Sequence, residues 1–124
     1  MLAALAHAAW LVRDHARVLG NTRVGCAARS TSGRIWLGCN VEHKYRSHDI
    51  HAEVNAIGSL IAGGDERLEA VFIAAERERF TPCGSCMDWI FELGGDSCLV
   101  AAQSSPGGQI LVLSAGELMP FYPA

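Results

Sequence analysis

Apolar residues near the start of the chain recur at spacings of three and four. This apolar stripe consists of Leu2, Leu5, Ala9, Val12, Ala16 and Leu19. Because an α-helix places such residues on one face, the pattern predicts an amphipathic helix over 2–19, ended by Gly20 and Asn21. The apolar run is short and has no basic leader, which favours a helix over a signal peptide or a membrane span.

The rest of the chain alternates between β-rich and helical patterns. Strands are predicted over 24–29, 35–40, 68–75, 98–102 and 109–113. Helices are predicted over 51–62, 83–93 and, capped by Ser114, up to Met119. The polar stretch 41–50 is predicted to be a loop, and 76–80 a charged connection. This order indicates an α/β fold in three layers, α/β/α, with helices on both faces of one sheet.

Composition narrows the class of protein. A chain of 124 residues, half of them hydrophobic, predicts a single domain over 1–124. The net charge of −3 and the lack of a basic stripe argue against tight nucleic-acid binding. Five cysteines, an odd number, fit metal-bound thiolates in a reducing compartment better than a disulfide framework. We therefore expect a cytoplasmic protein.

Two short stretches carry the chemistry: His51-Ala52-Glu53 and Pro82-Cys83-Gly84-Ser85-Cys86. One imidazole and two thiols suit zinc, and three protein ligands leave the fourth tetrahedral position for water, as in catalytic zinc sites. Glu53 is then a carboxylate beside the metal, able to accept a proton from water and deliver it to a leaving amine. The combination of H-x-E with P-C-x-x-C is the signature of zinc deaminases.

Each stretch alone is ambiguous. A single C-x-x-C is also found in redox pairs and in halves of structural zinc knuckles. Here, however, a predicted strand separates the two stretches and a predicted helix follows each, which favours a catalytic site. Both would lie at helix N-termini, where thiol pKa values are lowered.

The other cysteines and histidines fit simpler interpretations. Cys26, Cys39 and Cys98 are predicted to be small buried residues in strands. His7 and His15 are expected on the first helix as surface or packing residues. His43 and His48 lie in the loop before the site, and we interpret this loop as mainly solvated.

Further segments are similar to the small cytidine deaminases. Val24-Gly25-Cys26-Ala27 resembles their V-G-A-A, Gly38-Cys39-Asn40-Val41-Glu42 resembles their G-C-N-I-E, and Glu117-Leu118-Met119-Pro120 resembles their E-L-L-P. The resemblance implies a mixed five-stranded sheet and a homotetramer. It also implies that His51, Cys83 and Cys86 bind zinc, that Glu53 shuttles protons, that Asn40 and Glu42 bind ribose hydroxyls, and that Ala52 contacts substrate.

The sequence departs from that family in three places. Met87-Asp88 stands where Arg-Gln is usual, Asn21-Thr22-Arg23 lacks the aromatic residue that usually precedes V-G-A-A, and the loop holding Lys44, Tyr45, Arg46 and His48 is unusually polar. The leading hypothesis is zinc-dependent deamination of cytidine or deoxycytidine in pyrimidine salvage. A modified aminopyrimidine nucleoside, such as a nucleoside antibiotic, is an alternative substrate. A non-catalytic module that binds zinc or nucleic acid is a third hypothesis, which the acidic charge disfavours.

Overall fold

The computed structural model describes residues 1–78 and 81–122, and within these the chain forms one mixed sheet. The strand order is β2-β1-β3-β4-β5. The strands are β1 (Val24–Ser30), β2 (Ile35–Cys39), β3 (Leu68–Ala75), β4 (Leu99–Gln103) and β5 (Ile110–Ser114). Only β3 and β4 pair in parallel; the other three pairs are antiparallel. The five predicted strands are therefore confirmed, with small shifts at their ends.

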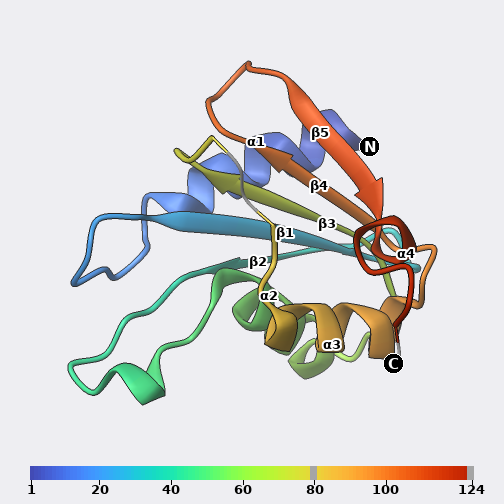
Figure 1. Ribbon diagram of the computed structural model, residues 1–124, viewed down its shortest axis with the longest axis horizontal. Helices are drawn as coiled ribbons and strands as arrows, with labels where there is room; N and C mark the ends of the chain where they lie inside the picture. Colours follow the sequence, from blue (N-terminus) through green and yellow to red (C-terminus); the bar gives the residue numbers. More distant parts are fainter. Residues whose placement is uncertain (79–80, 123–124) are drawn as a thin grey trace.

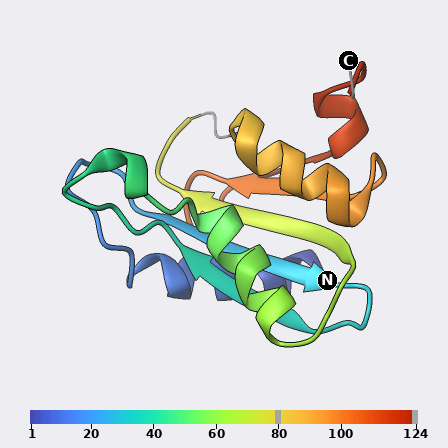
Figure 2. The same cartoon turned by 90° about the horizontal axis from the view of Figure 1, so that it is seen from below.

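Helices cover both faces of this sheet (Figures 1 and 2), which confirms the predicted three-layer arrangement. They are α1 (Leu2–Arg13), α2 (Ala52–Ala62), α3 (Gly84–Gly94) and the short α4 (Ala115–Leu118). Helix α1 packs on one face through Leu5 and Ala9, whereas α2 and α3 pack on the other through Ile57, Leu60 and Ile90. The central strand β3 supplies side chains to both cores, which is why it is buried at every position except Glu69.

Gly38 in β2 allows the start of α2 to lie directly on the sheet. A Cβ atom at this position would stand 2.2 Å from the backbone nitrogen of Ala56 and 2.6 Å from the carbonyl oxygen of Ala52. Only glycine permits this contact, because both neighbours are helix backbone. The close approach places the first turn of α2, with the H-A-E stretch, at the end of β2.

The prediction of a helix over 2–19 is wrong beyond Arg13. The chain turns after Asp14 and becomes extended at Arg17, which pairs in parallel with Val41. There the N–H of Arg17 donates to Asn40 at 3.0 Å, and the N–H of Glu42 donates to Arg17 at 2.7 Å. Pairing with the segment beyond β2 replaces the expected helical hydrogen bonds. As a result His15 lies after the helix.

The remaining expectations for the chain are mostly met. Loop 41–50 holds a single 3-10 turn, η1 (Arg46–His48). Cys26 and Cys98 are buried, with Cys98 just before β4, whereas Cys39 is partly exposed. Residues 79–80 of the predicted connection, and 123–124, lie outside the described residues. Within the described part of the chain, no helix has the length and apolar character needed to span a membrane.

Candidate metal centre and pocket

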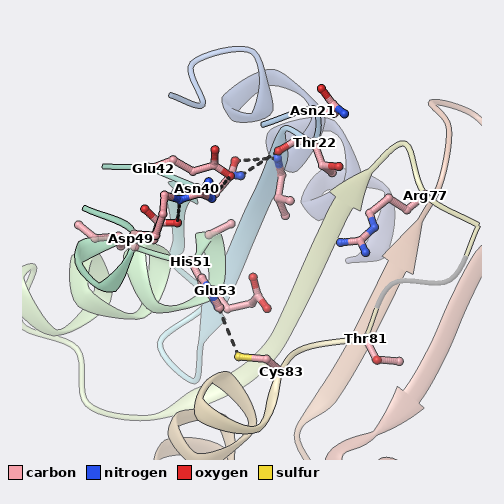
Figure 3. A pocket seen from close by; sticks show the side chains of 14 residues that line it. Asn21, Thr22, Asn40, Glu42, Asp49, His51, Glu53, Arg77, Thr81 and Cys83 are labelled. Carbon is pink, nitrogen blue, oxygen red and sulfur yellow. Dashed lines mark hydrogen bonds and ion pairs between the residues drawn. The ribbon is translucent and has the colours of Figure 1, made fainter. Parts of the chain in front are cut away.

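The three predicted zinc ligands meet where two helices begin. His51 is the N-cap residue of α2, Cys83 is the N-cap residue of α3, and Cys86 lies in the first turn of α3. The Cys83 Sγ atom lies 3.3 Å from His51 Nδ1 and 3.5 Å from Cys86 Sγ, and Cys86 Sγ lies 3.4 Å from the same imidazole nitrogen. Figure 3 shows His51 and Cys83 facing each other across the base of a pocket.

These distances fit a tetrahedral zinc ion. With usual zinc–sulfur and zinc–nitrogen bond lengths, neighbouring ligand atoms stand roughly 3.6–3.8 Å apart. The triangle seen here is a few tenths of an ångström smaller, so the ligand atoms need to separate only slightly around the ion. Within 1–78 and 81–122, His51, Cys83 and Cys86 are the one group of His, Cys, Asp and Glu residues arranged to hold a metal in this way. The donor set and the geometry therefore suit zinc.

The electrostatics of Cys86 differ from the expectation for a helix N-terminus. Burial, followed by the nearby Glu53 carboxylate, raises the pKa of the Cys86 thiol far above its ordinary value. Desolvation outweighs the helix dipole because this side chain is fully buried. Holding the Cys86 sulfur as a thiolate therefore requires a cation beside it, as a zinc ion would provide.

Glu53 lies beside the metal-binding triangle. Its side chain lines the pocket although the residue is only 2% exposed. Burial raises the pKa of Glu53, while the neighbouring Cys86 and His51 act in the opposite direction. A carboxyl group with a raised pKa holds a proton more readily than a free carboxylate does, which suits a group that must accept a proton and return it.

A pocket of about 370 Å³ opens above this triangle (Figure 3). This volume falls within the range of small-molecule sites. The three residues predicted to bind substrate, Asn40, Glu42 and Ala52, all line it. The described lining residues are Asn21, Thr22, Val24, Asn40, Glu42, Arg46, Asp49, Ile50, His51, Ala52, Glu53, Arg77, Thr81 and Cys83.

Asn40 and Glu42 both lie beyond the end of β2. The predicted strand 35–40 included Asn40, but β2 ends at Cys39. The Asn40 amide accepts from the N–H of Val24 at 2.8 Å and donates to the carbonyl of Thr22 at 2.9 Å. The Glu42 Oε1 atom accepts from two backbone N–H groups, those of Leu19 and Gly20. Both side chains are therefore held rigidly at the pocket.

Sequence reasoning missed several charged residues of the pocket. Arg46, Asp49 and Arg77 line it, whereas His43 and His48 do not. The two histidines instead form an exposed ring cluster with Tyr45. The spacing of Glu42, Arg46 and Asp49, at four and three residues, was the available signal for ion pairing.

The unusual Met87-Asp88 pair directly follows Cys86 in α3. Met87 is buried in the core beneath α3. Asp88 accepts a hydrogen bond from the Tyr122 hydroxyl at 2.8 Å, and the Tyr122 ring stacks on Phe91. In this chain the position after the second cysteine therefore serves packing and attachment of the C-terminal segment.

Comparisons with known proteins agree with this geometry. Residues 2–102 match the family model described as the cytidine and deoxycytidylate deaminase zinc-binding region. Among solved structures, cytidine deaminase from Burkholderia pseudomallei superposes with a TM-score of 0.88 at 31% identity, covering 98% of both chains. Cytidine deaminase from Mycobacterium leprae gives a TM-score of 0.82 at 30% identity, over 96% of this chain and 97% of that one.

Sequence relatives are longer than this chain. A cytidine deaminase from Shewanella pealeana is 34% identical over 95 residues, which are 75% of this chain but 29% of that protein. Cytidine deaminase 3 from Arabidopsis thaliana is 37% identical over 76 residues, 57% of this chain and 34% of the relative. The matched region thus spans about a third or less of these curated relatives. The family model covers most of this chain, and its matched range includes His51, Cys83 and Cys86, the residues arranged to hold a metal ion, so the chain belongs to the cytidine and deoxycytidylate deaminase zinc-binding family.

Proposed function

We propose that this protein is a zinc-dependent hydrolase that converts cytidine or deoxycytidine, with water, to the uridine product and ammonia. The observation that carries the proposal is the convergence of His51, Cys83 and Cys86 beside the buried Glu53 at the base of a nucleoside-sized pocket. This is the residue set that hydrolytic deamination of an aminopyrimidine requires.

Metal binding and proton transfer are assigned to different residues of the site. His51, Cys83 and Cys86 would hold the ion, and zinc, when bound, supplies the Lewis acidity that activates water at neutral pH. Glu53 accepts the proton of the attacking water and passes it to the ring nitrogen, then assists the departure of ammonia from C4. Its buried position excludes bulk water from these transfers.

Residues that line the pocket above the metal site would orient the substrate. Ala52 is the first residue of α2, so its backbone N–H has no intrahelical acceptor and can donate to the pyrimidine carbonyl oxygen. Asn40 and Glu42 would bind the sugar hydroxyls, since an amide and a carboxylate suit groups that both donate and accept.

Ammonia release tests the proposal directly. The protein, purified without added metal, would be assayed with cytidine, deoxycytidine, cytosine and base-modified aminopyrimidine nucleosides, alongside elemental analysis. We expect about one zinc per chain and fastest release from cytidine or deoxycytidine. Inertness toward the whole panel, with zinc present, would contradict the enzyme and favour a structural zinc module.

We further propose that residues 1–124 form one domain, and that the protein acts in the cytoplasm in pyrimidine salvage and has no nucleic-acid or membrane partner. The five unpaired thiols support a reducing compartment, and the net charge of −3 disfavours nucleic acid.

We also propose a homotetramer. Its support is the apolar C-terminal segment, where Phe121 is 87% exposed and Met119 is partly exposed. Light scattering at micromolar concentration should give four times the chain mass, and Phe121→Asp should lower it. A monomeric mass for the wild type would refute the assembly.

A further inference from the structure

Loop 41–50 projects from the body of the protein between β2 and α2 (Figures 1 and 2). Its base is closed by Val41 and Ile50, which exchange two backbone hydrogen bonds of 2.9 Å. The loop therefore leaves the end of β2 and returns to the start of α2 at one point, next to the pocket. Arg46 begins the 3-10 turn η1 within the loop and is one of the pocket-lining residues.

The Arg46 guanidinium is held between two carboxylates that also line the pocket. Its Nε atom donates to Asp49 at 2.8 Å, and its Nη2 atom lies 3.3 Å from Glu42 Oε2. Asp49 is itself oriented by the N–H of His43, at 2.7 Å. Figure 3 shows Glu42 and Asp49 on the side of the pocket opposite Arg77. These contacts hold the guanidinium in one orientation at the pocket wall.

The pocket wall formed by Glu42, Arg46 and Asp49 retains unused hydrogen-bond donors and acceptors. A guanidinium has five N–H donors, so contacts to two carboxylate oxygens leave donors for a third group. Glu42 Oε1 already accepts two backbone N–H groups, whereas Oε2 faces only Arg46 among the contacts described. The wall thus presents a donor from Arg46 beside an acceptor on Glu42. A hydroxyl group, which accepts and donates at once, is complementary to that pair.

We propose that Arg46 recognises the sugar of the nucleoside substrate by donating a hydrogen bond to a ribose hydroxyl whose own hydrogen is accepted by Glu42. This inference rests on the proposed function and adds a specificity-determining residue to it. The group recognised is a neutral hydroxyl and not a phosphate, because two carboxylates within 3.3 Å of the guanidinium would repel an anion at this wall.

The test compares Arg46→Gln with wild type on cytidine, on 2′,3′-dideoxycytidine and on cytosine. Loss of a charged hydrogen bond should lower kcat/KM for cytidine by roughly tenfold to a hundredfold. The two substrates that lack the hydroxyls should change by less than about threefold. Calorimetry provides a second readout: uridine binding should weaken in the variant, and binding of 2′,3′-dideoxyuridine should not.

Arg34→Gln is the matched control. Arg34 is also an exposed arginine paired with a carboxylate, that of Asp65, and its side chain is 61% exposed against 57% for Arg46. It does not line the pocket, so this variant should behave as wild type toward all three substrates. If Arg46→Gln does not fold, Arg46→Lys replaces it, because lysine keeps the charge but lacks the forked pair of N–H donors. This variant should lower kcat/KM for cytidine and the affinity for uridine by less than the amounts expected for Arg46→Gln. The substrates and ligands without the hydroxyls should be unaffected.

Two results would overturn the inference. An equal loss of kcat/KM on all three substrates would mean that Arg46 only maintains the loop. An unchanged kcat/KM for cytidine would mean that Arg46 does not recognise the sugar. Failure of the proposed function would look different. In that case the wild type would release no ammonia from any substrate, and the comparison of uridine with dideoxyuridine would still decide the role of Arg46.

Discussion

The two ends of the pocket are built in different ways. The metal end, formed by His51, Glu53, Cys83 and Cys86, stands on the first turns of α2 and α3, and these helices are packed on the sheet. The loop end consists of Asn40, Glu42, Arg46 and Asp49, which lie outside regular secondary structure except for the single turn η1. It is held by side-chain hydrogen bonds and ion pairs.

This difference separates chemistry from recognition. The metal end needs ligand atoms placed to within tenths of an ångström, and packed helices supply that rigidity. The loop end needs polar groups suited to one substrate, and loops tolerate substitution better than helices in a core. We therefore expect changes at the metal end to abolish the reaction, and changes at the loop end to alter which substrate is preferred.

The largest effect is expected for Cys83→Ser. Removing one thiolate should reduce zinc to below about a tenth of the wild-type content and abolish turnover, and the melting temperature should fall because metal binding and local folding are coupled. Elemental analysis measures the zinc content, ammonia release measures the turnover, and thermal denaturation measures the melting temperature. Cys39→Ser, at a partly exposed cysteine away from the triangle, is the control and should retain zinc. Full zinc in Cys83→Ser would contradict the ligand assignment.

Glu53→Gln should stop the proton transfers without removing the zinc. The amide conserves the shape of the side chain, so zinc content and fold should be retained, while kcat falls by at least about 10²–10⁴-fold. Steady-state ammonia release and elemental analysis check the two halves of this expectation. Glu66→Gln, at an exposed carboxylate, should leave both unchanged. A near-normal rate in Glu53→Gln would exclude it as the proton shuttle.

Asn40→Ala and Glu42→Ala should reduce the preference for nucleosides. Each removes a group proposed to bind the sugar, which typically costs about 1–3 kcal/mol, or roughly a tenfold to hundredfold loss in kcat/KM for cytidine. Cytosine, which has no ribose, should be spared. Asn40→Ala should also lower the melting temperature, because its amide bonds the backbone of Thr22 and Val24. If both variants deaminate cytidine normally, the ribose assignment is wrong.

The smallest effect concerns acid stability at the loop end. Backbone N–H donors from Gly20 and Leu19 lower the pKa of Glu42, and the N–H of His43 lowers the pKa of Asp49. A lowered folded-state pKa contributes stability that is present above the unfolded-state value, about 4, and is lost as pH falls through the folded-state value. The melting temperature of Glu42→Gln should therefore fall less steeply than that of wild type below about pH 4. Parallel curves for the two proteins would contradict this.

Local patterns predicted most of the elements and the metal end. The strands and the helices α2 and α3 follow from periodicity and from glycine stops, because each depends on a window of about ten residues. The candidate ligands His51, Cys83 and Cys86, which the structure brings together, follow from residue type and spacing. The same local reasoning failed at 14–19, where Ala16 and Leu19 continued a helical stripe that the chain does not use.

What the sequence by itself determined was therefore the candidate site: three residues of zinc-ligand type, a carboxylate close to them in sequence, and helices to hold them. Tertiary structure alone decided how these parts meet. It brings His51 to 3.3 Å from Cys83, 32 residues away, and it ends α1 at Arg13 so that Arg17 can pair with Val41. It also turns Arg46 back toward the pocket. Each of these depends on contacts between segments distant in sequence, whose free energies no local window contains.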